Sequence, residues 1–97
     1  MHEKEYKGKL ITKVAGVGTK SEGPEYYLEL LEPNEFGQKE LGVGKDAHMW
    51  EKDEKLHPFV SKMVVILGEQ VIVKHTTFEG TEKVESLYPI DIKELED

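Results

Sequence analysis

Histidine and serine are the residues of this chain best suited to acid–base or nucleophilic chemistry, and their spacing forms no catalytic pattern. Asp46 and His48 are two positions apart, and residues at that spacing do not share a helix face. The sequence holds no His-Glu-x-x-His motif and no serine in a nucleophile-elbow setting. The histidines and serines are His2, His48, His57, His75, Ser21, Ser61 and Ser86. We therefore expect no catalytic residues, no metal site and no cofactor, and a protein that is not an enzyme.

The composition excludes further classes of function. Because there is no cysteine, the chain has no disulfide, no thiolate zinc site and no cysteine nucleophile. Its 13 basic and 20 acidic side chains give a net charge of −7, which disfavours nucleic acid as a partner. No apolar run approaches the roughly 18 residues of a membrane-spanning helix, and residues 1–9 are charged where a signal peptide would be apolar. We expect a cytoplasmic protein that does not enter the membrane.

Charged residues make up 34% of the chain, whereas Asn34, Gln38 and Gln70 are its only side-chain amides. This bias resembles that of proteins from hot environments, in which ion-pair networks are more useful. An ordinary solvated surface would give much the same composition, so the bias points to no function.

The elements that must position any site are organised around one apolar stretch, Met63–Val73. It is the most hydrophobic and most β-branched segment of the chain, which predicts a central strand or a tightly linked pair of strands. This segment is expected to extend toward Phe78 and to turn at 79–81. Shorter alternating segments predict further strands, with turn signals rich in glycine, proline and asparagine between them. These strands are expected at 5–14, 25–31, 38–43 and 82–92. Residues 1–97 are expected to form a single domain.

One helix is expected between the third and fourth strands. Asp46 can cap a helix that begins at Ala47, and no glycine, proline or β-branched residue interrupts it before Pro58 ends it. The predicted fold is mainly β, a barrel of five to six strands with this one helix. The element order, and the segment Leu56–Gly68 in particular, resembles the OB-fold, a five-stranded Greek-key barrel. A half-open barrel of the SH3 kind is the alternative.

The resemblance to the OB-fold implies a binding surface on the second and third strands. Large aromatic side chains are enriched at protein interfaces, which makes the aromatics near these strands candidates for contact. These candidates are Tyr26, Tyr27, Phe36 and Trp50. Residues 21–61 hold ten acids and four lysines, so this surface lacks the positive charge of a single-strand binder. In the alternative interpretation, one of the adjacent tyrosines Tyr26 and Tyr27 fills the barrel and the other covers its edge.

Lysines lie mostly elsewhere in the sequence. Residues 1–20 hold five lysines and two glutamates, and two more lysines flank the central strand. If the first and fourth strands pair, as the resemblance implies, these lysines could form one stripe that contacts an anion or a nucleic acid. The candidates are Lys7, Lys9, Lys13, Lys62 and Lys74. The alternative is that they protect a sheet edge or pair with the acids of residues 79–97.

These observations favour a binding or assembly module that contacts another protein or a second copy of itself. An acidic rim would select a basic partner. Weak binding of single-stranded nucleic acid through the lysine stripe is the second reading, and a small metal-binding or catalytic domain is the third.

Overall fold

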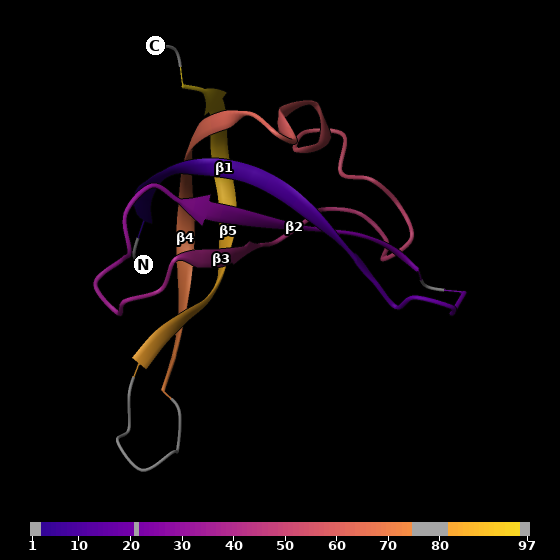
Figure 1. Cartoon of the computed structure of the whole chain (residues 1–97), viewed down its shortest axis with the longest axis horizontal. Helices are drawn as coiled ribbons and strands as arrows, with labels where there is room; N and C mark the ends of the chain where they lie inside the picture. Colours follow the sequence, from indigo (N-terminus) through magenta and orange to yellow (C-terminus); the bar gives the residue numbers. More distant parts are fainter. Residues whose placement is uncertain (1–2, 21, 75–81, 96–97) are drawn as a thin grey trace.

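The computed structural model describes residues 3–20, 22–74 and 82–95 (Figure 1). These residues form the strands β1 (Glu3–Ala15), β2 (Gly23–Leu30), β3 (Glu40–Val43), β4 (Met63–Lys74) and β5 (Glu82–Glu94), with a 3₁₀ turn, η1 (His57–Phe59), before β4. The strands make one sheet that closes on itself in the order β1-β2-β3-β5-β4. The prediction of a mainly β chain with five principal strands is therefore confirmed. No helix among the described residues is long and apolar enough to cross a membrane.

The segment predicted as the central strand is β4. It pairs antiparallel with β1 on one side and with β5 on the other. Val64 and Ile66 are completely buried, and Val65, on the opposite face, is only 7% exposed. The predicted pairing of the first and fourth strands is confirmed as well. The expected extension of this strand to residues 75–78 and the turn at 79–81 lie outside the described residues.

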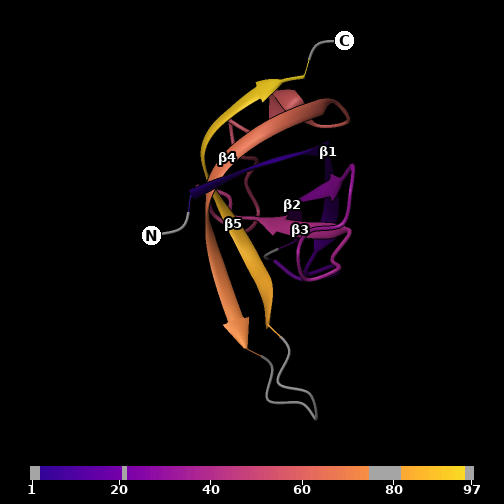
Figure 2. The same cartoon turned by 90° about the vertical axis from the view of Figure 1, so that its left-hand side faces the viewer.

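Two glycines lie where the pairing of the long strands changes, at Gly8 in its partner and at Gly68 in its register. At Gly8, β1 changes from pairing with β4 to pairing with β2. A Cβ at this position would overlap the carbonyl oxygen of Glu29, so the close approach of the two backbones requires glycine. At Gly68 the register between β4 and β5 shifts. Beyond the pairing of Ser86 with β3, the two strands continue together past the other strands (Figures 1 and 2).

The core fills the inside of the closed sheet with alternate residues from each strand. Tyr6 and Leu10 of β1 face inward, on the parity that is mainly apolar in the sequence. On β2, where the sequence left the inward face open, Tyr26 and Leu28 face inward. The remaining members of the cluster are Leu41, Val43, Leu56, Val64, Ile66, Val84 and Leu87.

The predicted helix at 47–56 was wrong. A helix would need the N–H groups of Asp53 and Lys55 to donate to the carbonyls of Met49 and Glu51, and all four groups have other partners. The carbonyls of Met49 and Glu51 accept from the Lys45 ammonium, at 2.7 Å each. The matching donors, the N–H groups of Asp53 and Lys55, bond instead to the Tyr26 hydroxyl at 3.0 Å and to the Asp53 carboxylate at 2.8 Å. Residues 45–52 therefore form an irregular loop, and Asp53 rather than Asp46 caps the single turn that leads into η1.

The closed sheet is joined between β3 and β5, the one parallel pairing of strands in the described sheet. Only Gly42 with Ser86 and Val43 with Leu87 are paired there. The side chain of Gln38 extends this join, because its amide accepts from the Val84 N–H at 2.9 Å and donates to the Val84 carbonyl at 3.0 Å. Asn34 donates to the same Gln38 oxygen at 2.9 Å and so fixes the amide in place.

Candidate functional site

A groove of about 520 Å³ crosses the outer face of β2, β3 and β5. Tyr27 on β2, Gly42 on β3 and Ser86 on β5 lie in one row across these strands. Because Gly42 has no side chain, the floor of the groove is exposed backbone. The walls include Tyr27, Met49 and Tyr88, and Met49 and Tyr88 are 48% and 54% exposed. The groove is thus a shallow channel with an unobstructed floor and large, partly apolar walls.

Two charged side chains, Glu25 and Lys13, contact Tyr27. Its hydroxyl donates to Glu25 Oε2 at 3.1 Å, and Lys13 Nζ lies 4.6 Å from the centre of its ring. The same ammonium is 2.6 Å from Glu40 Oε1, which raises the pKa of Lys13. Burial, followed by the hydrogen bond to Glu25, raises the pKa of Tyr27 above its ordinary value. The hydrogen bond to Glu25 and the contact with Lys13 orient the ring in the wall of the groove.

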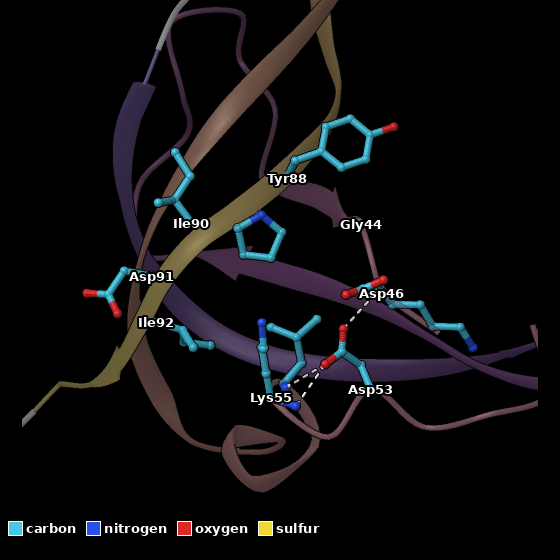
Figure 3. Close-up of a pocket in the computed structure, with 11 residues that line it drawn as sticks. Gly44, Asp46, Asp53, Lys55, Tyr88, Ile90, Asp91 and Ile92 are labelled. Carbon is cyan, nitrogen blue, oxygen red and sulfur yellow. Dashed lines mark hydrogen bonds between the residues drawn. The ribbon is translucent and has the colours of Figure 1, made fainter. Parts of the chain in front are cut away.

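A second pocket of about 410 Å³ adjoins the groove (Figure 3). Gly44, Lys45 and Tyr88 line both hollows. The Tyr88 ring packs directly over Gly44, where a Cβ would lie 2.6 Å from a ring carbon. The pocket continues along β5 past Ile90 and Asp91, and Lys55 extends into it from the opposite wall. Its mixture of acidic, basic and apolar side chains selects no single class of ligand.

The loop at 45–53 forms the shared wall of both hollows, and it is tied down at two points. Lys45 Nζ donates to the carbonyls of Pro24, Met49 and Glu51, each at 2.7 Å. Asp53, 4% exposed, accepts from the N–H groups of Asp46, Lys55 and Leu56. Because backbone donors occupy both of its oxygens, the Asp53 carboxylate acts as a structural cap rather than as a general acid or base.

With this geometry defined, the chain was compared with known proteins. No protein-family model, curated protein or solved structure matches it. The site must therefore be interpreted from its own chemistry.

The four predicted aromatic contacts divide into different environments. Tyr26 is 1% exposed and belongs to the core, so it offers no contact area, while Tyr27 forms a groove wall. This is the expected alternative in which one tyrosine of the pair fills the interior. Phe36 is partly buried against the core. Trp50 is 57% exposed and stacks on His48, with ring centres 4.7 Å apart and the planes 1° from parallel.

The predicted lysine stripe is broken, because Lys13 and Lys74 lie far along their strands from the neighbouring Lys7, Lys9 and Lys62. Lys7 and Lys9 face outward on β1, opposite Val65 and Met63 of β4. Lys13 is about 13 Å beyond Lys9 along β1 and is paired with Glu40. Lys62 Nζ lies 3.1 Å from Glu94 Oε1, as the ion-pairing alternative expected. Lys74 ends β4 about 35 Å of strand away from Met63, and its side chain lies outside the described residues.

Sequence reasoning missed Met49, Tyr88 and Lys45 as site residues. The pairing of β3 with β5 brings Tyr88 beside the groove, and no local pattern encodes that pairing. The one available signal was the pair Gly42 and Gly44, which weakens the third strand as a strand and leaves its outer face bare. Within the described residues, no group of three or more histidine or acidic side chains could hold a metal ion.

Proposed function

We propose that this protein is a non-enzymatic, OB-like binding module that holds an extended, basic segment of another protein in the groove between Tyr27 and Tyr88. The OB-like assignment is supported by the closed order β1-β2-β3-β5-β4 and by the pairing of β1 with β4. OB-folds bind ligands on the face of their second and third strands, where this groove lies.

The observation that carries the proposal is the floor of the groove. Gly42 leaves the backbone bare between Tyr27 and Tyr88, so an extended chain can lie close to the strand there. Tyr27 and Tyr88 can then pack against its side chains. Tyrosines of this kind supply much of the binding energy at protein interfaces.

The charge around the groove favours a basic occupant. Glu25 and Glu29 on β2 and Glu40 on β3 face outward here, and Lys13 supplies one opposing charge. Lys45 lines the groove, but its ammonium donates to three carbonyls rather than to the open channel. A partner segment rich in lysine and arginine would find complementary charge along this face.

The test is a titration of the isotope-labelled protein with a short peptide in which arginine and lysine alternate with apolar residues. We expect amide shifts at Tyr27, Gly42, Gly44 and Tyr88. Tyr88→Ala should weaken binding by about 2 kcal/mol, which is about thirtyfold. Leu31→Ala is the matched control, since Leu31 is an exposed apolar residue outside the groove.

Two results would reject this function. Equal response to the same peptide with glutamate in place of its basic residues would show that charge does not select the partner. Concentration-dependent shifts of the groove amides without any peptide would assign the groove to a second copy of this chain.

Weak binding of single-stranded nucleic acid is the second candidate. A cluster of lysines on the outer face of the sheet, around Val65 of β4, favours it. Val65 lies between Lys7 on β1 and Lys93 on β5, and Lys9 is next to Lys7 on the outer face. These three lysines form no ion pair with any described residue. Binding of a thymidine oligonucleotide that falls steeply with salt, and that Lys7→Glu with Lys9→Glu abolishes, would support it. No binding at low salt would exclude it.

A further inference from the structure

Lys45 makes more hydrogen bonds than any other lysine among the described residues. It follows β3 directly, and its ammonium donates to the carbonyl oxygens of Pro24, Met49 and Glu51 at 2.7 Å each. An ammonium group has three donors, so all of them are used. The three acceptors come from two separate parts of the chain, the start of β2 and the loop after Lys45.

The carbonyl oxygens of Pro24, Met49 and Glu51 converge on one point, as they would around a bound cation. We call these three carbonyl groups the carbonyl nest. Carbonyl oxygens that face one another repel, so the arrangement requires a positive group at its centre. Hydrogen bonds from a charged donor are shorter and about twice as strong as neutral ones, and the three short distances fit this.

We propose that Lys45 is the positioning residue of the groove and that its ammonium acts as a built-in cation in the carbonyl nest. The nest contains the carbonyl of Met49, whose side chain is a wall of the groove. Gly23 lets the loop approach β2 closely, because a Cβ there would lie 2.6 Å from the Cα of Trp50. The Lys45 ammonium therefore holds Met49 and Trp50 against the start of β2, because it bonds to Met49 and Pro24 at once.

The effect of Lys45 on ligand binding rests on the proposed function of the groove, whereas its effect on the loop does not. Without the ammonium, the acceptors at Met49 and Glu51 lose their partner, while the donors at Asp53 and Lys55 remain bonded elsewhere. The loop then loses its attachment to Pro24 but gains no helical hydrogen bond. We expect it to become mobile, with the core intact.

The first experiment needs no substitution. In the intact protein, the Lys45 ammonium protons should exchange with water more slowly than those of the exposed lysines, as measured by nitrogen-15 NMR of the ammonium groups. Exchange of the Lys45 protons as fast as that of Lys52 would refute the nest.

The second experiment compares Lys45→Met with Lys52→Met, a control that removes an exposed lysine from the same loop. In Lys45→Met we expect faster amide exchange at Glu51, whose N–H donates to the His48 carbonyl within the loop. We also expect altered Trp50 fluorescence and about tenfold weaker binding of the basic peptide. Lys52→Met should leave the exchange rates and the fluorescence unchanged. Unchanged loop exchange in a folded Lys45→Met protein would refute the proposal.

The third experiment tests the chemistry of the nest through Lys45→Ala, which leaves room for a small amine. Propylammonium chloride should restore the wild-type Trp50 fluorescence, because it carries the same three donors. Tetramethylammonium chloride should not, since it has charge but no donor. Lys45→Arg should also fail, because a planar guanidinium does not present three converging donors. Equal rescue by both salts would mean that charge alone, and not the nest, orders the loop.

The two proposals can fail separately. If the wild-type protein binds no basic peptide but Lys45→Met frees the loop, the groove function is wrong and the positioning role stands. If the peptide binds and Lys45→Met changes neither the loop nor the affinity, the positioning role is wrong and the groove function stands.

Discussion

Tyr26 shows how one hydroxyl group can organise a buried polar site. The hydroxyl accepts from the Asp53 N–H at 3.0 Å and lies 3.1 Å from His57 Nδ1. Since the hydroxyl has a single proton and two acceptor lone pairs, it can bond to His57 Nδ1 while it accepts from the Asp53 N–H. The side chain therefore fills the core and also joins β2 to the turn that precedes η1.

Substitution of Tyr26 by phenylalanine should destabilise the fold. It keeps the ring but leaves the Asp53 N–H buried without a partner, at a cost of about 1 to 3 kcal/mol. Urea denaturation at neutral pH would measure this change in the free energy of unfolding. Tyr88→Phe is the control, because Tyr88 is 54% exposed and its hydroxyl bonds to no described residue. Equal stability of Tyr26→Phe and wild type would contradict the role of the hydroxyl.

Stability should fall at alkaline pH because of three tyrosines. Burial raises the pKa of Tyr6, Tyr26 and Tyr27 above the ordinary value of 10.0. The native state therefore keeps protons that the unfolded chain releases, so this contribution is complete below about pH 10 and is lost as pH rises through the native pKa values. Urea denaturation at a series of pH values from about 9 to 11 would measure the decline. The slope should be smaller in Tyr26→Phe, and an unchanged slope would contradict the contribution of Tyr26.

At the scale of elements, glycine decides where strands can change partners. Gly8 lies where β1 passes from β4 to β2, with the carbonyl of Glu29 against its Cα. Without that close approach, a single strand could not belong to both halves of the sheet.

Replacement of Gly8 by alanine should therefore be costly. The added methyl overlaps backbone that cannot rotate away, so we expect a loss of about 3 kcal/mol. Lys9→Ala, one residue along on the exposed face, should change the free energy of unfolding by less than about 0.5 kcal/mol. Thermal and urea denaturation of both variants would decide. Similar stabilities for the two would show that the strands can separate at Gly8 without penalty.

The strands could be predicted from the sequence because their signals are local. The β-branched run at 63–73 and the alternation in 5–14 and 25–31 predict the strands. The helix at 47–56 was wrong for a non-local reason, since Lys45 and Tyr26 occupy its hydrogen-bonding groups. The sequence left open whether Tyr26 or Tyr27 faces outward, and core packing decides it, whereas Tyr88 depends on the pairing of β3 with β5. Local patterns thus predicted the strands but neither the loop at 45–52 nor the full set of groove residues.

At the scale of the whole molecule, acidic side chains outnumber basic ones, and few of those that the structure describes are paired. The net charge is −7, and the described ion pairs lie between exposed side chains. Exposed pairs contribute little, about 0 to 1 kcal/mol each. Repulsion among the excess carboxylates therefore has more influence on stability than the attraction within these pairs.

Added salt should accordingly stabilise the protein and weaken its binding of the basic peptide. Screening reduces the internal repulsion, so raising sodium chloride from about 0.05 M to 0.5 M should increase the free energy of unfolding by up to about 1 kcal/mol. The same change should lower peptide affinity, because salt screens the attraction that we propose between the basic peptide and the acidic side chains around the groove. Urea denaturation and peptide titration at the two concentrations would check both directions. A protein that salt destabilises would show that its ion pairs outweigh the repulsion.

The short join between β3 and β5 has a further consequence. Two residue pairs and one glutamine side chain close the sheet there, which makes it the place where the ring should open first during native-state fluctuations. The groove spans this join, since Gly42 and Ser86 lie on opposite sides of it. A partner seated across both strands would hold them together. Occupancy of the groove and closure of the ring are therefore thermodynamically linked, and each favours the other by the same factor.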